Sequence, residues 1–121
     1  MDAGALSVAL STVPDADTGL RIARALVEER LIACANLLPG VTSVYRWEGA
    51  VHADAELLLV MKTRRALLPR LAERVRELHP YALPEVIGLP LEGGLPAYLT
   101  WVGDETTPRI AAEGSLREQG E

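Results

Sequence analysis

Cysteine and aromatic residues are scarce in this chain of 121 residues. There is no phenylalanine, and the single cysteine, Cys34, excludes an intrachain disulfide and any need for an oxidising compartment. No apolar run approaches the roughly 18 residues that a membrane helix needs, and no basic segment precedes an apolar one at the N-terminus. We therefore expect a cytoplasmic protein that neither spans a membrane nor is secreted.

Basic charge is also in short supply, because 17 acidic residues outnumber 12 basic ones and give a net charge of −5. Nucleic acid and anionic membranes are bound by clustered lysine and arginine, so no nucleic-acid partner and no membrane partner are expected. The chain also lacks a G-x-S-x-G elbow, a P-loop, an H-E-x-x-H motif and a C-x-x-C pair. These absences favour a protein that is not an enzyme.

Hydrophobic periodicity and turn residues predict an alternation of strands and helices. Strands are expected over residues 5–11, 41–47, 56–61 and 86–91, helices over 16–31 and 66–78, and a short final element over 95–102. Pro39-Gly40 is interpreted as a break before the second strand, and the segment from Trp47 to Asp54, which includes His52, as a hairpin turn. The third strand is expected to be buried on both faces.

The apolar residues of the first helix predict which face it packs, and the prolines of the second predict where it begins and ends. In the first helix Leu20, Ala23, Val27 and Leu31 recur at helical spacing and are expected to face the sheet, with Ile22 and Leu26 beside them. In the second, Pro69 is tolerated only in the first turn, so the helix is expected to begin near Ala66 or to bend at Pro69, and His79-Pro80 ends it.

This order predicts an α+β fold, a ferredoxin-like βαββαβ sandwich with an antiparallel sheet. The domain is expected over residues 1–103, with a polar C-terminal tail over residues 104–121. Such a sheet has open edges, and a strand that is apolar on both faces needs a cover, which association of copies would supply.

Five blocks of sequence, spread in order from about residue 6 to residue 102, resemble the signature blocks of the CutA divalent-cation-tolerance family. They are Ala33-Cys34-Ala35-Asn36, Ser43-Val44-Tyr45-Arg46-Trp47-Glu48-Gly49, Lys62-Thr63, His79-Pro80-Tyr81 with Pro84-Glu85, and Tyr98-Leu99-Thr100-Trp101. The resemblance implies a homotrimer, a fold similar to that of the PII signalling proteins, and a link to copper and other divalent cations.

Cys34 and His79 are the candidate metal ligands, because thiolate and imidazole suit Cu(II) or another divalent cation. Cys34 also corresponds to a cysteine that the family is thought to use for copper. The alternatives are a packed core thiol in the apolar segment around Cys34 and a helix-end residue at His79. Some relatives carry a second cysteine near the end of the first strand, but residues 10–13 contain none, so one chain cannot form a two-thiol site. No organic cofactor is expected, and His52 is interpreted as a solvated residue.

A second group of polar and aromatic residues resembles the lining of a family cleft between subunits. These ligand-cleft candidates are Lys62, Glu48, Glu56, Tyr81, Glu85 and Trp47. Lys62 is conspicuous because it is the only lysine. The alternative is an intersubunit salt-bridge network that serves assembly alone, and the aromatic residues are interpreted first as trimer contacts.

Three hypotheses for the function follow. The first is a homotrimeric, non-enzymatic protein that binds a divalent cation such as copper. The second is a PII-like regulatory module that binds a small molecule or a protein partner in the intersubunit cleft, and the third is a purely structural scaffold.

Overall fold

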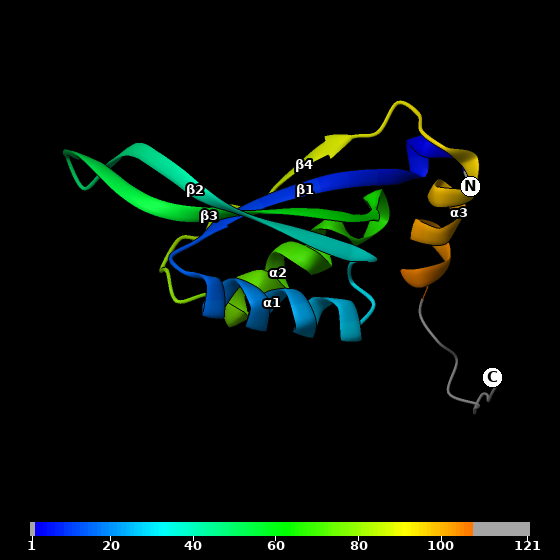
Figure 1. The fold of residues 1–121 in the computed structure, drawn as a ribbon, viewed down its shortest axis with the longest axis horizontal. Helices are drawn as coiled ribbons and strands as arrows, with labels where there is room; N and C mark the ends of the chain where they lie inside the picture. The colour runs from blue at the N-terminus through cyan, green and yellow to red at the C-terminus, as the bar shows by residue number, and fades with distance from the viewer. Residues whose placement is uncertain (1, 108–121) are drawn as a thin grey trace.

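The computed structural model describes residues 2–107, which form a four-stranded antiparallel sheet and three α-helices (Figure 1). The elements are β1 (Leu6–Val13), α1 (Ala16–Glu28), β2 (Cys34–Trp47), β3 (Ala50–Arg64), α2 (Leu68–Leu78), β4 (Ile87–Pro90) and α3 (Pro96–Glu105). The strand order β2-β3-β1-β4 places β3 and β1 at the centre of the sheet. This arrangement confirms the ferredoxin-like βαββαβ fold, to which α3 is added.

The hydrophobic core lies between one face of the sheet and the helices α1 and α2 (Figure 1). Its buried residues are Ala9 and Val13 from β1, Ile22 and Leu26 from α1, Leu31 and Ile32 after it, Leu59 and Met61 from β3, and Leu71 and Val75 from α2. A smaller cluster joins Leu6 of β1 to Leu99 and Val102 of α3 at one end of the sheet. The helices α1 and α2 therefore cover one face of the sheet only.

The opposite face of the sheet carries apolar side chains outside this core. Strand alternation and pairing register place six of them there: Val8, Leu10, Leu58, Val60, Ile87 and Leu89. We call these six residues the open sheet face. Ile87 and Leu89 are 50% and 47% exposed, and the other four are half-buried. Within one chain, Leu59 and Met61 on one side of β3 are fully buried, whereas Leu58 and Val60 on the other side are only half-buried. Burial of this strand on both faces, as the sequence predicts, is therefore found for one face only.

The second strand begins earlier than the sequence predicts, at Cys34 instead of residue 41. Pro39-Gly40 does not break the strand, because the pairing with β3 continues past it after a register shift between Leu38 and Val41. Gly40 has a φ of 82°, a conformation that suits glycine, so the two residues form an irregularity inside a long strand.

The hairpin turn is shorter than expected. Trp47 pairs with Ala50, and the loop between them is Glu48-Gly49, with φ angles of 49° and 81°. Positive φ at both loop residues is the feature of a type I′ turn, whose twist matches that of the strands. His52 lies in β3 opposite Tyr45, so its predicted place in the turn is wrong.

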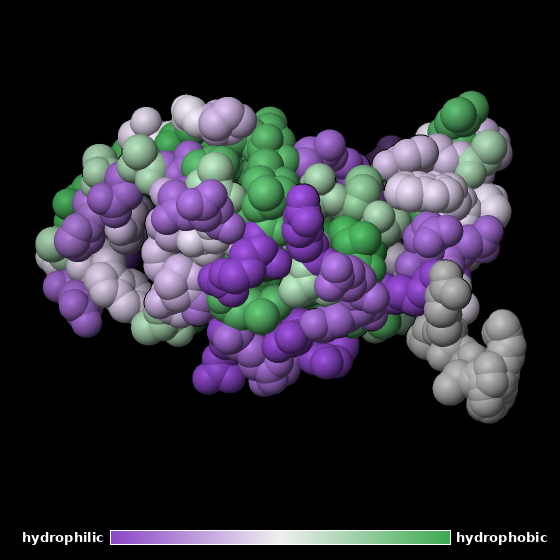
Figure 2. Space-filling view, turned by 60° about the horizontal axis from the view of Figure 1, so that its bottom comes forward, coloured by the Kyte–Doolittle hydropathy of each residue, from purple (hydrophilic) through white to green (hydrophobic). Residues whose placement is uncertain are grey.

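The first helix ends at Glu28, and Leu31 lies after it in a buried segment. The predicted packing face was partly wrong, since Leu20 and Val27 are 47% and 42% exposed while Ile22 and Leu26 are fully buried. The helix carries two apolar stripes and only one can face the sheet. The other contributes to hydrophobic patches that remain on the surface (Figure 2).

The remaining elements agree more closely with the sequence. The second helix begins at Leu68 with Pro69 in its first turn, where a missing amide proton costs little. The fourth strand is shorter than expected, and the final element is a helix that extends to Glu105. Residues 108–121 of the expected polar tail lie outside the described residues. No helix in the described part of the chain is long and apolar enough to cross a membrane.

Two serines of β1 provide a matched test of buried hydrogen bonding. Ser7 donates to the Leu89 carbonyl oxygen at 2.8 Å, whereas the fully buried Ser11 hydroxyl has no hydrogen-bond partner among residues 2–107. We expect Ser7→Ala to lower the free energy of unfolding by about 1 kcal/mol. We expect Ser11→Ala to raise it by about 1 kcal/mol, because an unsatisfied polar group leaves the core. Urea unfolding at one protein concentration measures the free energy of unfolding of both variants. An equal loss of stability in the two variants would contradict the hydrogen bonding described for Ser7 and Ser11.

Candidate functional site

A cleft of about 650 Å³ lies where the β2-β3 hairpin projects from the body of the molecule. It is lined by Thr12, Glu56 and residues 43–47 of the strands, and by residues 81–83 and Glu85 of the loop after α2. We call it the hairpin cleft, and a hollow is visible beside the hairpin at the left of Figure 2. A volume of this size falls in the range that small-molecule sites occupy.

Glu56 is the buried acid of the hairpin cleft. Its exposure is 7%, and it accepts a hydrogen bond from the Tyr81 hydroxyl at 2.6 Å. Burial of Tyr81, together with this bond, raises the pKa of the Tyr81 phenol well above its usual value. Tyr81 therefore remains a protonated donor to the Glu56 carboxylate.

A second tyrosine and carboxylate pair lies next to the cleft on the hairpin. The Tyr45 hydroxyl donates to Asp54, and this bond is the main cause of the raised pKa of Tyr45. The Tyr45 ring also stacks on His52, with ring centres 5.4 Å apart. These contacts hold the Tyr45 ring in place at the edge of the cleft.

His79 positions the loop that carries Tyr81. It is 8% exposed, its Nε2 donates to the Thr12 carbonyl oxygen at 2.8 Å, and its Nδ1 accepts from the Tyr81 backbone amide at 3.1 Å. Because both ring nitrogens are occupied, His79 would have to give up one of these bonds to ligate a metal. In this structure His79 thus makes the contacts expected of the alternative, a residue that ends the helix and positions the following turn.

Cys34 and Lys62 lie together near the other end of the sheet. They are paired across β2 and β3, the Cys34 thiol lies 3.4 Å from the Tyr98 hydroxyl, and the Lys62 ammonium donates to Asn36. Cys34 is half-buried within one chain. The bond to Cys34 and partial burial raise the pKa of Tyr98 to about 12.

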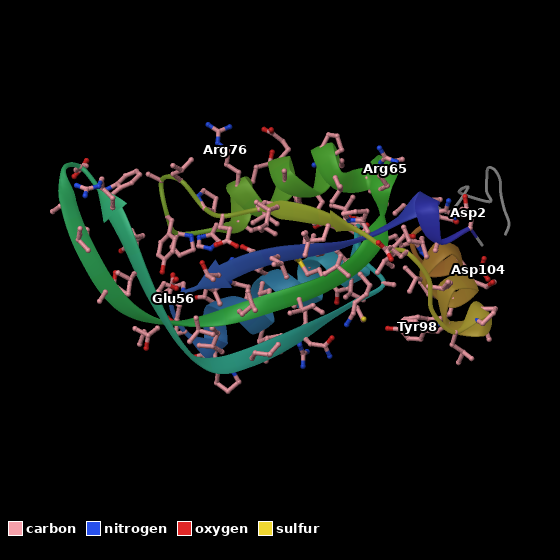
Figure 3. The ribbon with its side chains drawn as sticks, turned by 90° about the horizontal axis from the view of Figure 1, so that it is seen from above. Asp2, Glu56, Arg65, Arg76, Tyr98 and Asp104 are labelled. Carbon is pink, nitrogen blue, oxygen red and sulfur yellow. The ribbon has the colours of Figure 1, made fainter. Side chains whose placement is uncertain are left out.

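One chain does not bring the two metal candidates together. Cys34 pairs with Lys62, whereas His79 contacts Thr12, which pairs with Leu58. Lys62 and Leu58 are four residues apart, or about 13 Å along β3. In Figure 3, Tyr98, the neighbour of Cys34, and Glu56, the partner of Tyr81, lie toward opposite ends of the sheet. No three His, Cys, Asp or Glu side chains within residues 2–107 are grouped so that they could hold a metal ion. Residues 2–107 of a single chain therefore do not complete a metal site.

The structure does not bring the six ligand-cleft candidates together in one place. Trp47, Glu56, Tyr81 and Glu85 line the hairpin cleft, whereas Glu48 lies in the hairpin turn and Lys62 lies beside Cys34. Sequence reasoning missed Arg46 as a lining residue. Its position in the block from Ser43 to Gly49 was the available signal, because that block also supplies Trp47.

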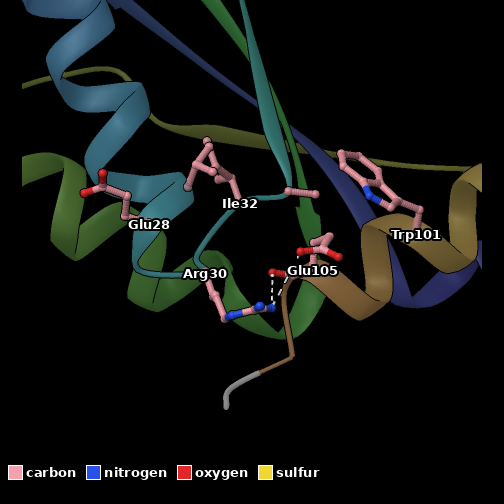
Figure 4. A pocket seen from close by; sticks show the side chains of 7 residues that line it. Glu28, Arg30, Ile32, Trp101 and Glu105 are labelled. Atoms are coloured by element: carbon pink, nitrogen blue, oxygen red, sulfur yellow. Dashed lines mark hydrogen bonds and ion pairs between the residues drawn. The ribbon is translucent and has the colours of Figure 1, made fainter.

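A second cavity of about 460 Å³ lies between the end of α1 and α3 (Figure 4). Arg30 donates to the carbonyl oxygens of Asp104 and Glu105 and lies 3.8 Å from the Glu105 carboxylate. These contacts satisfy carbonyl groups at the C-terminal end of α3, where a cation is favoured by the helix dipole. We assign Arg30 a role in holding α3, and Trp101 also lines this cavity.

Comparisons with known proteins agree on one family. The family model described as "CutA1 divalent ion tolerance protein" matches residues 7–105. The "Divalent-cation tolerance protein CutA" of Thermus thermophilus is 52% identical over 99 residues, which cover 82% of this chain and 96% of that protein. The mouse "Protein CutA" is 48% identical over 112 residues, or 93% of this chain and 63% of the mouse protein.

The solved structures lead to the same result. The divalent cation tolerance protein Cut A1 from Thermus thermophilus superposes with a TM-score of 0.82 at 50% identity. The match covers 84% of this chain and 99% of that one. The fold and the sequence are therefore similar over the same part of the chain.

The tyrosines provide a test of the site geometry by pH. All three have raised pKa values, so the folded state favours the protonated phenol. The resulting stabilisation is present below pH 10 and is lost as the pH rises, for Tyr98 through about 12. We expect Cys34→Ala to shift the Tyr98 transition toward 10, as followed by phenolate absorbance, and to leave the other two unchanged. Titration of all three tyrosines near pH 10 in the folded protein would contradict the hydrogen bonds described.

Proposed function

The chain belongs to the CutA1 divalent ion tolerance family, and from this premise we propose that it contributes to divalent-cation tolerance as a non-enzymatic homotrimer. The family assignment confirms the resemblance drawn from the five sequence blocks. The observation that carries the proposed assembly is the open sheet face, whose six apolar side chains lie outside the core formed with α1 and α2.

The open sheet face supports association because its six apolar side chains lie on adjacent strands, with the polar Thr12 and Lys62 on the same face at its two ends. A contiguous apolar surface of this kind costs free energy in water and is typical of a subunit interface. Packing of equivalent faces buries it without any other protein. The resemblance to the family supplies the number of subunits, three.

We assign Cys34 as the residue that binds copper in this trimer. It is the only thiol in the chain, it is half-buried, and a thiolate is a soft ligand that suits copper. His79 is the weaker candidate because Thr12 and Tyr81 occupy both of its ring nitrogens. The remaining ligands would come from outside the single chain.

We also propose that the protein works in the cytoplasm. The printed names of relatives include other locations, since the Arabidopsis thaliana protein is named chloroplastic and the Archaeoglobus fulgidus protein periplasmic. The single cysteine fits a reducing compartment.

The assembly is tested by placing a charge on the open sheet face. We expect Val60→Lys to convert the trimer into monomers, because each interface would then bury an unpaired ammonium group. Light scattering after size-exclusion chromatography measures the mass. Leu20→Lys is the matched control, since it adds the same charge on the exposed side of α1 and should leave the trimer intact. A Val60→Lys trimer as stable as the parent would exclude this face as the interface.

Copper binding is tested by native mass spectrometry with and without Cu(II). We expect a trimer that retains copper, and we expect Cys34→Ser to lose it. His52→Ala serves as the control, because His52 is an imidazole on the hairpin, away from Cys34. Copper retained by Cys34→Ser would exclude Cys34 as the ligand and would leave the trimer assignment untouched.

A further inference from the structure

We propose that the hairpin cleft binds a small organic cation, an amine whose ammonium group lies against Glu56 between the aromatic rings of Trp47 and Tyr81. This proposal goes beyond cation tolerance and does not depend on copper binding at Cys34. It rests on the burial and the neighbours of Glu56.

Glu56 is a buried acid with one hydrogen-bond partner and no counter-charge among the described residues. A carboxylate has about four lone-pair directions for hydrogen bonds, and the one partner that Glu56 has among the described residues is the neutral Tyr81 hydroxyl. No ion pair to Glu56 is found within residues 2–107. Because a buried charge without a counter-charge is costly, the cleft favours a positively charged occupant.

The walls of the cleft determine which kind of cation fits. Tyr45, Trp47 and Tyr81 line it and are 42%, 41% and 36% exposed, so parts of their ring surfaces remain accessible. Aromatic faces attract ammonium groups through their negative quadrupole, and tryptophan does so most strongly. The cleft therefore pairs an acid with aromatic surfaces, which is the chemistry that recognises an organic ammonium group.

A bare metal ion fits the same cleft less well. The acidic groups that line it are Glu56 and Glu85, and the described residues provide no third carboxylate, imidazole or thiol grouped with them. Arg46 also lines the cleft and its positive charge opposes any cation. Glu56 is buried, however, whereas Arg46 is exposed. Solvent and salt therefore screen a charge on Glu56 less than they screen the charge on Arg46.

The two tryptophans of the chain make the proposal measurable, because Trp47 lies in the hairpin cleft and Trp101 lines the other cavity. The full-length protein labelled with 5-fluorotryptophan should give two fluorine resonances, assigned with Trp47→Phe and Trp101→Phe. We expect benzylammonium chloride to shift the Trp47 resonance in a saturable way and to leave that of Trp101 unchanged. Benzyl alcohol is the neutral control of nearly the same shape and should shift neither at the same concentration.

Two variants then test the role of the buried acid. Glu56→Gln keeps an oxygen that can accept from Tyr81 but removes the charge, and we expect it to weaken benzylammonium binding about tenfold. Glu105→Gln, which removes an acid from the cavity beside Trp101, should leave the affinity unchanged. Arg46→Gln should tighten binding, because it removes a like charge.

Three results would overturn the proposal. They are an equal shift with benzyl alcohol, an unchanged affinity in Glu56→Gln, and a trimer that dissociates in Glu56→Gln while benzylammonium never shifts Trp47 in the parent. The last result would mean that a neighbouring subunit supplies the cation. Failure of copper binding at Cys34 would leave all of these readouts unaffected.

Discussion

The sheet has apolar side chains on both faces, and the helices of the described chain cover the two faces unequally. This unequal cover governs the rest of the structure. The face with Ala9, Leu59 and Met61 forms the core with α1 and α2. On the opposite face α3 packs against Leu6 at one end, while Leu10, Leu58 and Val60 lie outside both buried clusters. A chain of this size folds around its core and is still left with an apolar surface, so its fold and the assembly we propose follow from the same hydrophobic pattern.

The long hairpin separates the functional chemistry into two regions. Toward one end of β3, Cys34, Lys62 and Tyr98 bring a thiol, an ammonium and a phenol together. Toward the other, the projecting strands and the loop fixed by His79 enclose Glu56. The proposed copper ligand and the proposed organic-cation site therefore involve different side chains, and a substitution in one region need not disturb the other.

The order of the elements was predictable from the sequence because strand and helix periodicities differ and because Pro14, Pro69 and Pro80 mark boundaries. The extent of β2 was not, because Pro39-Gly40 resembles a break and only the partner strand shows that pairing resumes after it. The packing face of α1 was ambiguous for a similar reason. Two apolar stripes are equivalent in the sequence until the sheet selects one of them.

The residues of the candidate site that lie in short sequence blocks were predictable, whereas the relations that depend on strand pairing were not. Trp47, Tyr81 and Glu85 belong to sequence blocks that lie at one cleft, and Glu56 joins them through β3. The separation of Cys34 from His79 depends on strand register, which sequence spacing does not reveal. The engagement of both His79 nitrogens depends on Thr12, which is distant in the sequence.

The two-residue turn at Glu48-Gly49 has a consequence for how the chain folds. Because the turn joins β2 directly to β3, their cross-strand pairs are local in sequence, and closing such a short loop costs little entropy. The hairpin can therefore form early, before the more distant pairing of β1 with β4. Since the hairpin carries residues 43–47 and Glu56, one wall of the cleft and its acid would be assembled first, and the loop with His79 and Tyr81 would close over them later.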